Sequence, residues 1–233
     1  AFDYQSIYSP SGLNPDYTGV MGLNNFDDSW GIWGHNLRKV LGDNVDKVYA
    51  TIHGKTDDSQ LCFSSEEMYR QIESYIVDNI GEKGSSRFVI APDDTPYACT
   101  CASCTAMGNT EKNATPAVTE LLLRLSQRFP KHSFFTISYL STKQVTDKQL
   151  PSNAGIIVSA IDFPLRRIDG KNAQEKKFMQ QLNQWKKVSK NIYIWDYINN
   201  FDDYLTPFPI LKIAQQRLRF FKQNGASGIF FNG

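Results

Sequence analysis

Residues 115–139, TPAVTELLLRLSQRFPKHSFFTISY, join an amphipathic helix to a buried strand and so decide the class of fold. Pro116 is typical of a first helical turn, and apolar residues recur at helical spacing from there to Pro130. Residues 134–139 are instead a continuous apolar and aromatic run of strand length. A helix that leads into a strand buried on both faces is typical of α/β folds with parallel strands.

The same alternation of strands and helices extends through most of the chain. Three further helices have recognisable starts: Ser64 and Glu67 form a capping box, Asn172 and Glu175 open a second helix, and Pro209 opens a third. Short β-branched and aromatic runs predict the strands. They lie at residues 2–8, 30–33, 87–91, 134–139, 156–161, 192–197 and 228–231, with a weaker one at 60–63.

Eight such strands predict an α/β fold of a particular kind, an irregular (β/α)8 TIM-like barrel. Residues 141–155 contain Pro151, Asn153 and Gly155 and show no helical pattern, so we expect the barrel to lack one or more outer helices. No linker or internal repeat divides the sequence. We therefore expect one domain over residues 1–233, which could also be a fragment of a larger protein with partner domains.

Composition excludes several classes of function. The 25 Lys and Arg residues balance 24 Asp and Glu residues, so the chain lacks the basic surface that nucleic-acid binding requires. No apolar run approaches the roughly 20 residues of a membrane-spanning helix, and the first ten residues do not resemble a signal peptide. We expect a protein with no membrane span that is secreted, periplasmic or on the cell surface, its signal peptide absent from this chain.

Polar and aromatic side chains follow the predicted strands, where barrels place their active sites. Carboxylates, amides and rings are the mixture that carbohydrate sites use, since rings stack on sugar faces and polar groups bind hydroxyls. Glycoside hydrolysis also needs two carboxyl groups roughly 5–10 Å apart. We therefore predict Asp94 and Asp196 as a catalytic pair, with no catalytic cofactor. The predicted carbohydrate-binding residues are His35, Trp33, Asp93, Tyr139, Asp162, Tyr197 and Asn232.

Each of these residues also has a purely structural explanation. An Asp at a strand end often caps a helix or forms a turn, His35 could be a hydrogen-bonded core histidine, and Trp33 could fill the barrel. The functional interpretation depends on the gathering of several such residues at one end of the sheet.

Four cysteines form a second group. Cys99, Cys101 and Cys104 occur within six residues, and Cys62 follows the weak strand. This spacing suits a tetrahedral structural zinc site. One or two disulfides, or buried free thiols, are the alternatives. A closed shell of four thiolates leaves no position for a reactive water, so the zinc would not be catalytic.

The order of these motifs resembles a known domain family. WGIWGHN at 30–36, the CTCASC loop at 99–104 and WDYINNF at 195–201 resemble a bacterial domain family of unknown function, allied to glycoside hydrolase barrels of the α-glucuronidase and hexosaminidase type. The resemblance covers nearly the whole chain and implies a barrel that acts on glycans, or derives from one. The matching positions are His35, Asp94, Asp196, Tyr197 and the four cysteines.

Two departures from that family bear on catalysis. Asp93 stands where the family usually has Asn, and Phe231 stands where the final strand usually carries Glu. Three functions therefore remain open: a glycoside hydrolase acting through strand-end carboxylates, a non-catalytic glycan-binding domain, and a structural module of a larger protein. The first is the leading hypothesis.

Overall fold

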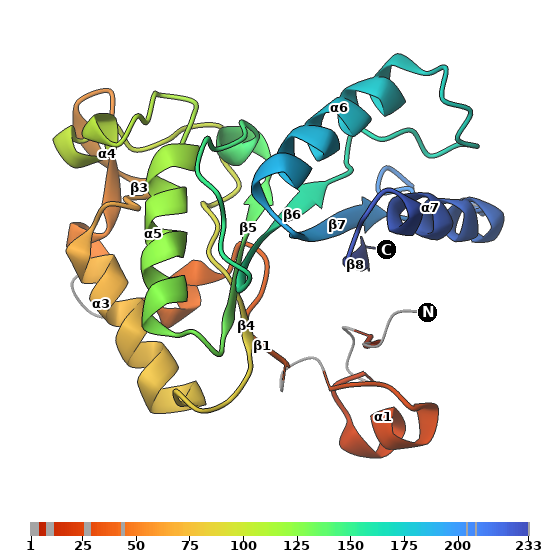
Figure 1. Cartoon of the computed structure of the whole chain (residues 1–233), viewed down its shortest axis with the longest axis horizontal. Coiled ribbons are helices and arrows are strands. Elements are labelled where there is room, and N and C mark those ends of the chain that lie inside the picture. Colours follow the sequence, from red (N-terminus) through yellow and green to blue (C-terminus); the bar gives the residue numbers. More distant parts are fainter. Residues whose placement is uncertain are drawn as a thin grey trace.

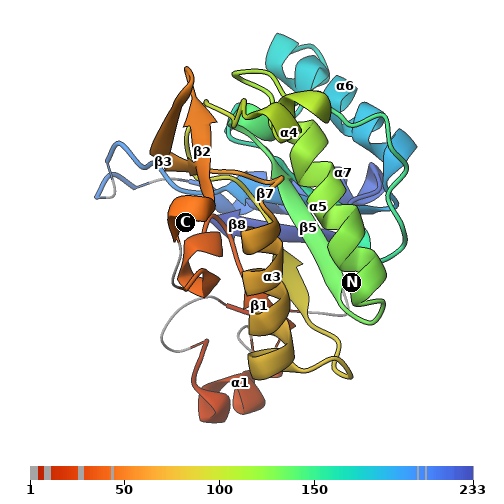
Figure 2. The ribbon, with the colours of Figure 1, turned by 90° about the vertical axis from the view of Figure 1, so that its left-hand side faces the viewer.

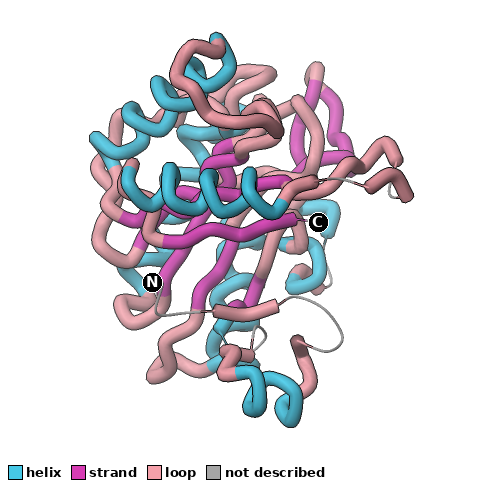
Figure 3. Tube along the Cα trace, turned by 90° about the vertical axis from the view of Figure 1, so that its right-hand side faces the viewer, coloured by secondary structure: helices cyan, strands magenta, loops and turns pink. Residues whose placement is uncertain are grey.

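A computed structural model describes residues 5–7, 12–25, 29–42, 45–203, 205–207 and 209–232. Within these residues, six parallel strands form one sheet in the order β1-β4-β5-β6-β7-β8 (Figures 1 and 3). The strands are β1 (Trp30–Ile32), β4 (Arg87–Val89), β5 (Ser133–Ser138), β6 (Ala154–Ser159), β7 (Asn191–Tyr197) and β8 (Gly228–Asn232).

The sheet is an open, curled half-barrel. Trp33, just after β1, touches Trp195 of β7 and Phe230 of β8 with ring centroids 5.1 and 4.9 Å apart, so the two ends of the sheet curl toward each other. No pairing between β1 and β8 closes the sheet among the described residues. The predicted (β/α)8 TIM-like barrel is therefore wrong, although the α/β class is correct.

The expected strand at 60–63 explains much of this error. These residues contribute to β3 (Lys55–Leu61), which pairs antiparallel with β2 (Tyr49–Ile52) in a hairpin separate from the main sheet. His53 and Gly54 at its turn have φ of 50° and 77°, as a two-residue type I′ turn requires. The expected strand at 2–8 lies largely outside the described residues, and residues 5–7 are not in a strand.

Helices cover the outer face of the half-barrel. The helices are α1 (Pro15–Met21), α3 (Glu66–Tyr75), α4 (Ala102–Ala106), α5 (Thr115–Arg128), α6 (Ala173–Val188) and α7 (Leu211–Gln223), and α3 continues into a π-helical turn, η3 (Ile76–Ile80). In Figure 2, α3 and α5 lie side by side in front of β5, with the β2–β3 hairpin beyond their upper ends. Helices α6 and α7 cover β6 and β7 through Phe178, Leu182, Trp185 and Phe221.

Shorter helical turns complete the chain. These 3₁₀ turns are η1 (Leu37–Val40), η2 (Val45–Lys47) and η4 (Leu140–Thr142). Beyond η4, residues 143–153 form no helix, which confirms the expected gap between β5 and β6. Within the described residues, no helix combines the length and apolar composition that a membrane crossing requires.

The predicted helix starts are correct to within two residues, with one informative error. Asn172 caps α6 by accepting hydrogen bonds from the backbone N–H groups of residues 174 and 175. The cap of α3 is Ser65, whose Oγ accepts from Met68 N at 3.2 Å, instead of Ser64. Ser64 turns its hydroxyl to the cysteine cluster, within 3.1 Å of Cys104 Sγ.

Both faces of the sheet are apolar. On β7, Ile192 and Ile194 pack outward against the helices, whereas Tyr193 and Trp195 point to the inner face. Trp30, Phe135 and Ile137 continue that inner face. Side chains alternate between the two faces along a strand. This alternation therefore decides whether a residue at a strand end points to the inner or the outer face.

Candidate functional site

A cavity of about 610 Å³ opens at the carboxyl ends of the strands. Residues that follow or end β1, β4, β5, β6, β7 and β8 contribute to it, so the curled sheet brings together residues far apart in sequence. Ligands of open α/β sheets bind at this end of the strands. The cavity is lined by His35, Asp94, Ile137, Tyr139, Ser159, Ile161, Leu165, Trp195, Tyr197, Asn199, Asn200, Phe201, Asp202 and Asn232.

Five of the predicted site residues are thus brought together: His35, Asp94, Tyr139, Tyr197 and Asn232. Trp33 does not line the cavity. Its ring stacks on Trp195 with planes 10° apart and so supports a wall residue from behind.

Asp94 and two tyrosines form the polar centre of the cavity. Burial raises the pKa of Tyr139 above its usual value, and the negative charge of the nearby Asp94 raises it further. Burial is also the main reason why the pKa of Tyr197 is raised, with smaller contributions from Tyr139 and Asp94. Both phenols therefore stay protonated at neutral pH and can donate hydrogen bonds to a ligand.

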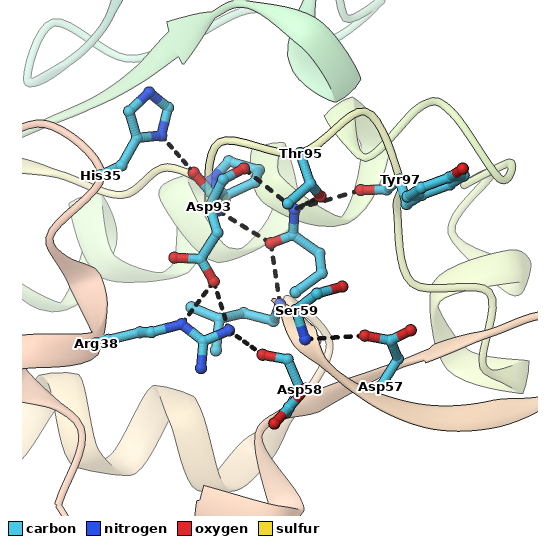
Figure 4. Close-up of polar contacts among 11 residues, drawn as sticks. His35, Arg38, Asp57, Asp58, Ser59, Asp93, Thr95 and Tyr97 are labelled. Carbon is cyan, nitrogen blue, oxygen red and sulfur yellow. Dashed lines mark hydrogen bonds and ion pairs between the residues drawn. The ribbon is translucent and has the colours of Figure 1, made fainter.

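His35 is held in one orientation at the edge of the cavity. Its Nδ1 lies 2.6 Å from the carbonyl oxygen of Pro92 (Figure 4). Because a carbonyl oxygen only accepts, Nδ1 carries a proton, and Nε2 of the neutral ring carries a lone pair. The ring centroid is 6.1 Å from that of Tyr139. The histidine is therefore a candidate acceptor for a ligand hydroxyl.

The structure does not bring Asp196 to the cavity. Asp196 points to the same, outer face of β7 as Ile192 and Ile194, and its side chain is fully buried against Arg217 of α7. The guanidinium donates from Nε to Asp196 Oδ2 at 2.7 Å and from NH2 to Oδ1, and it lies over the Phe163 ring. Asp94 and Asp196 therefore lie on opposite faces of the sheet and do not form a pair.

Asp93 and Asp162 also have partners outside the cavity lining. Asp93 accepts from Arg38 Nε at 2.7 Å, and the exposed Asp162 is paired with Lys143 at 2.9 Å. The expected Glu position at the end of the chain, Phe231, is in register with Asp196, while its neighbours Phe230 and Asn232 face inward.

Sequence reasoning missed the loop after β7. Asn199, Asn200, Phe201 and Asp202 follow Tyr197 directly and line the cavity. The sequence could have indicated this loop. It directly follows Asp196 and Tyr197, which were both predicted site residues, and it is rich in amides and carboxylates. Asp202 and Asp94 are the carboxylates among the described lining residues.

The four cysteines gather in one place with no disulfide. The Sγ atoms of Cys62, Cys99, Cys101 and Cys104 all lie within 4.8 Å of one another. Cys62 Sγ is 3.7 Å from Cys101 Sγ and 3.8 Å from Cys104 Sγ. A tetrahedral site with metal–sulfur bonds of about 2.3 Å has edges of about 3.8 Å, so the spacing is compatible with a structural metal.

Neighbouring groups favour thiolate in this cluster. The N–H of Thr51 donates to Cys99 Sγ at 3.2 Å, and Ser64 Oγ lies 3.1 Å from Cys104 Sγ. Hydrogen bonds from Cys104 and Cys62 lower the pKa of Cys99, while contacts with Cys62 and Cys99, together with burial, raise the pKa of Cys104. Without a cation, the protein therefore stabilises a thiolate at Cys99 but not at its neighbours. A bound cation would stabilise thiolates at all four cysteines.

The open parallel sheet and its strand-end cavity define an α/β protein with a cavity at the carboxyl edge of the sheet. Residues 37–233 match the family model of the domain of unknown function DUF4838, so the chain belongs to that family. No curated protein and no solved structure shows significant similarity to it.

Proposed function

We propose that the strand-end cavity binds a carbohydrate. The observation that carries this proposal is the convergence of Tyr139, Trp195 and Tyr197 with Asp94 and His35 in one cavity. Flat aromatic faces stack on sugar rings, while carboxylates, amides and phenols bind hydroxyls.

A glycan array with the wild-type protein and Tyr197→Ala tests this proposal. Loss of one stacking ring removes about 1.5 kcal/mol, so we expect about a tenfold weaker response to every bound saccharide. Tyr17→Ala on α1 is the control, since Tyr17 is a surface tyrosine that does not line the cavity. A wild-type protein that binds no saccharide, or equal binding by Tyr197→Ala, would contradict the proposal.

Hydrolysis is the second candidate function, favoured by the presence of both Asp94 and Asp202 in the cavity lining. In this mechanism the two carboxyl groups, and not Asp196, would act as acid and as nucleophile or base. The protein would then cleave aryl glycosides, and Asp94→Asn or Asp202→Asn would each lower kcat by about 10²–10⁴-fold. Turnover no faster than in buffer would leave the cavity as a binding site only.

We further propose that the cysteine cluster holds a structural Zn²⁺ ion. The tetrahedral spacing of the sulfurs, the absence of disulfides and the hydrogen bonds from Thr51 and Ser64 support this assignment. Zinc would join Cys62, next to β3, to the loop that carries the other three cysteines. It would thereby fix the hairpin against the segment that follows β4.

A further inference from the structure

The segment 93–97 connects the cavity to the cysteine loop. It begins at Asp93, includes Asp94 and ends two residues before Cys99, and it forms neither helix nor strand. Such a segment needs partners for its backbone groups if it is to hold a side chain in one position. Figure 4 shows that these partners converge from β3 on Asp93, Thr95 and Tyr97.

Gln60, near the end of β3, supplies most of them. Its Nε2 donates to Asp93 O at 3.2 Å, to Thr95 Oγ1 at 3.1 Å and to Tyr97 O at 3.3 Å. Its Oε1 accepts from Asp93 N at 3.0 Å and from the N–H of Leu61 at 2.9 Å. The residue is only 1% exposed. One buried amide thus binds both ends and the middle of the segment.

Arg38 fixes the side chain next to Asp94. Its Nε donates to Asp93 Oδ2 at 2.7 Å, and its NH2 donates to the backbone oxygen of Asp58 on β3. Asp93 is therefore turned toward the hairpin, while Asp94 lines the cavity. The two adjacent carboxylates have different roles because Arg38, itself bonded to the hairpin, binds only the first.

We infer that Gln60 is the positioning residue of the site, which holds the 93–97 segment so that Asp94 faces Tyr139 in the cavity. This inference deepens the proposed function and rests on it for its biological meaning. Gln60 is 33 residues distant from Asp93 in sequence and contributes no atom to the cavity lining. No other side chain of the described residues bonds to three residues of the segment.

The position of Asp94 beside Tyr139 in the cavity provides a test that needs no saccharide. At neutral pH, the ¹³Cζ NMR signal of Tyr139 responds to the nearby Asp94 carboxylate, and Tyr139→Phe assigns the signal. Asp94→Asn marks its position without the carboxylate. Gln60→Met keeps the side-chain length but not the amide. We expect it to move the Tyr139 signal by at least half of the difference between the wild-type protein and Asp94→Asn. Hydrogen exchange of the 93–97 amides should become faster as well.

Asn153→Leu is the matched control. Its amide also donates to three backbone carbonyls, those of residues 126, 129 and 132, but it lies just before β6, at the amino ends of the strands. It should lower the melting temperature without moving the Tyr139 signal. Thr95→Val removes one acceptor of Gln60, and serves if Gln60→Met does not fold, with a smaller shift in the same direction.

An unchanged Tyr139 signal in the folded Gln60 and Thr95 variants would overturn the inference, as would an equal shift in Asn153→Leu. If the shift occurs and no saccharide binds, Gln60 positions Asp94 but the carbohydrate proposal fails. The two results are therefore distinguishable.

Discussion

Replacing Asp196 with Asn is expected to lower the free energy of unfolding by about 3–5 kcal/mol, because it leaves the buried Arg217 guanidinium without a countercharge. Both side chains are fully buried, and the arginine also donates to Pro164 O at 2.7 Å. The pair therefore fixes α7 and the loop after β6 to β7. Urea unfolding of wild-type and variant proteins measures the loss.

Asp162→Asn is the control for this experiment. Asp162 also pairs with a basic residue, but its side chain is 69% exposed, so the change should be at most about 1 kcal/mol. The double variant Asp196→Leu with Arg217→Met should recover most of the lost stability, since no charge is then buried. A stable Asp196→Asn protein that fails only in turnover would restore this residue to a catalytic role and contradict the structural assignment.

Removal of the zinc ion proposed for the cysteine cluster is expected to have an effect of similar size. Structural zinc contributes folding free energy directly, so chelation should lower Tm by about 10 °C or more. The β2–β3 hairpin and α4 should lose order first, because the cysteines join them. Elemental analysis of the native protein should give one zinc per chain, with four thiols released on denaturation with a chelator.

Two single substitutions distinguish the loss of a metal ligand from other effects of mutation near the cluster. Cys62→Ser should lose the zinc, whereas Ser103→Ala, on α4 beside Cys104 but exposed and outside the cluster, should keep it. Native protein with no metal and no free thiol would contradict the zinc assignment and indicate disulfides. Native protein with four free thiols and an unchanged Tm on chelation would indicate a cluster of buried thiols.

The strands and helices could be predicted because their signals are local. The apolar runs around Phe134, Ile156 and Ile192 are long enough to form strands, and Asn172 marks a helix start by its own side chain. Closure of the barrel was not predictable in this way. The run at 60–63 has strand character, but only its partners show that it belongs to a hairpin.

The direction of side chains at strand ends was also beyond the sequence. On β7, Trp195 and Asp196 are adjacent, and both faces of the sheet are apolar, so no alternation indicates which one points to the cavity. The same ambiguity affects Asp93 and Asp94. The cysteine cluster was easier to predict, because three of its members lie within one short loop and coordination chemistry limits what they can do.

The most direct test of carbohydrate binding is a crystal structure of the protein with the saccharide that gives the strongest array response. We predict a sugar ring in the strand-end cavity, with one face against Tyr197 or Trp195 and hydroxyls within hydrogen-bond distance of Asp94 and His35. A saccharide bound elsewhere on the molecule, with this cavity empty, would contradict the account.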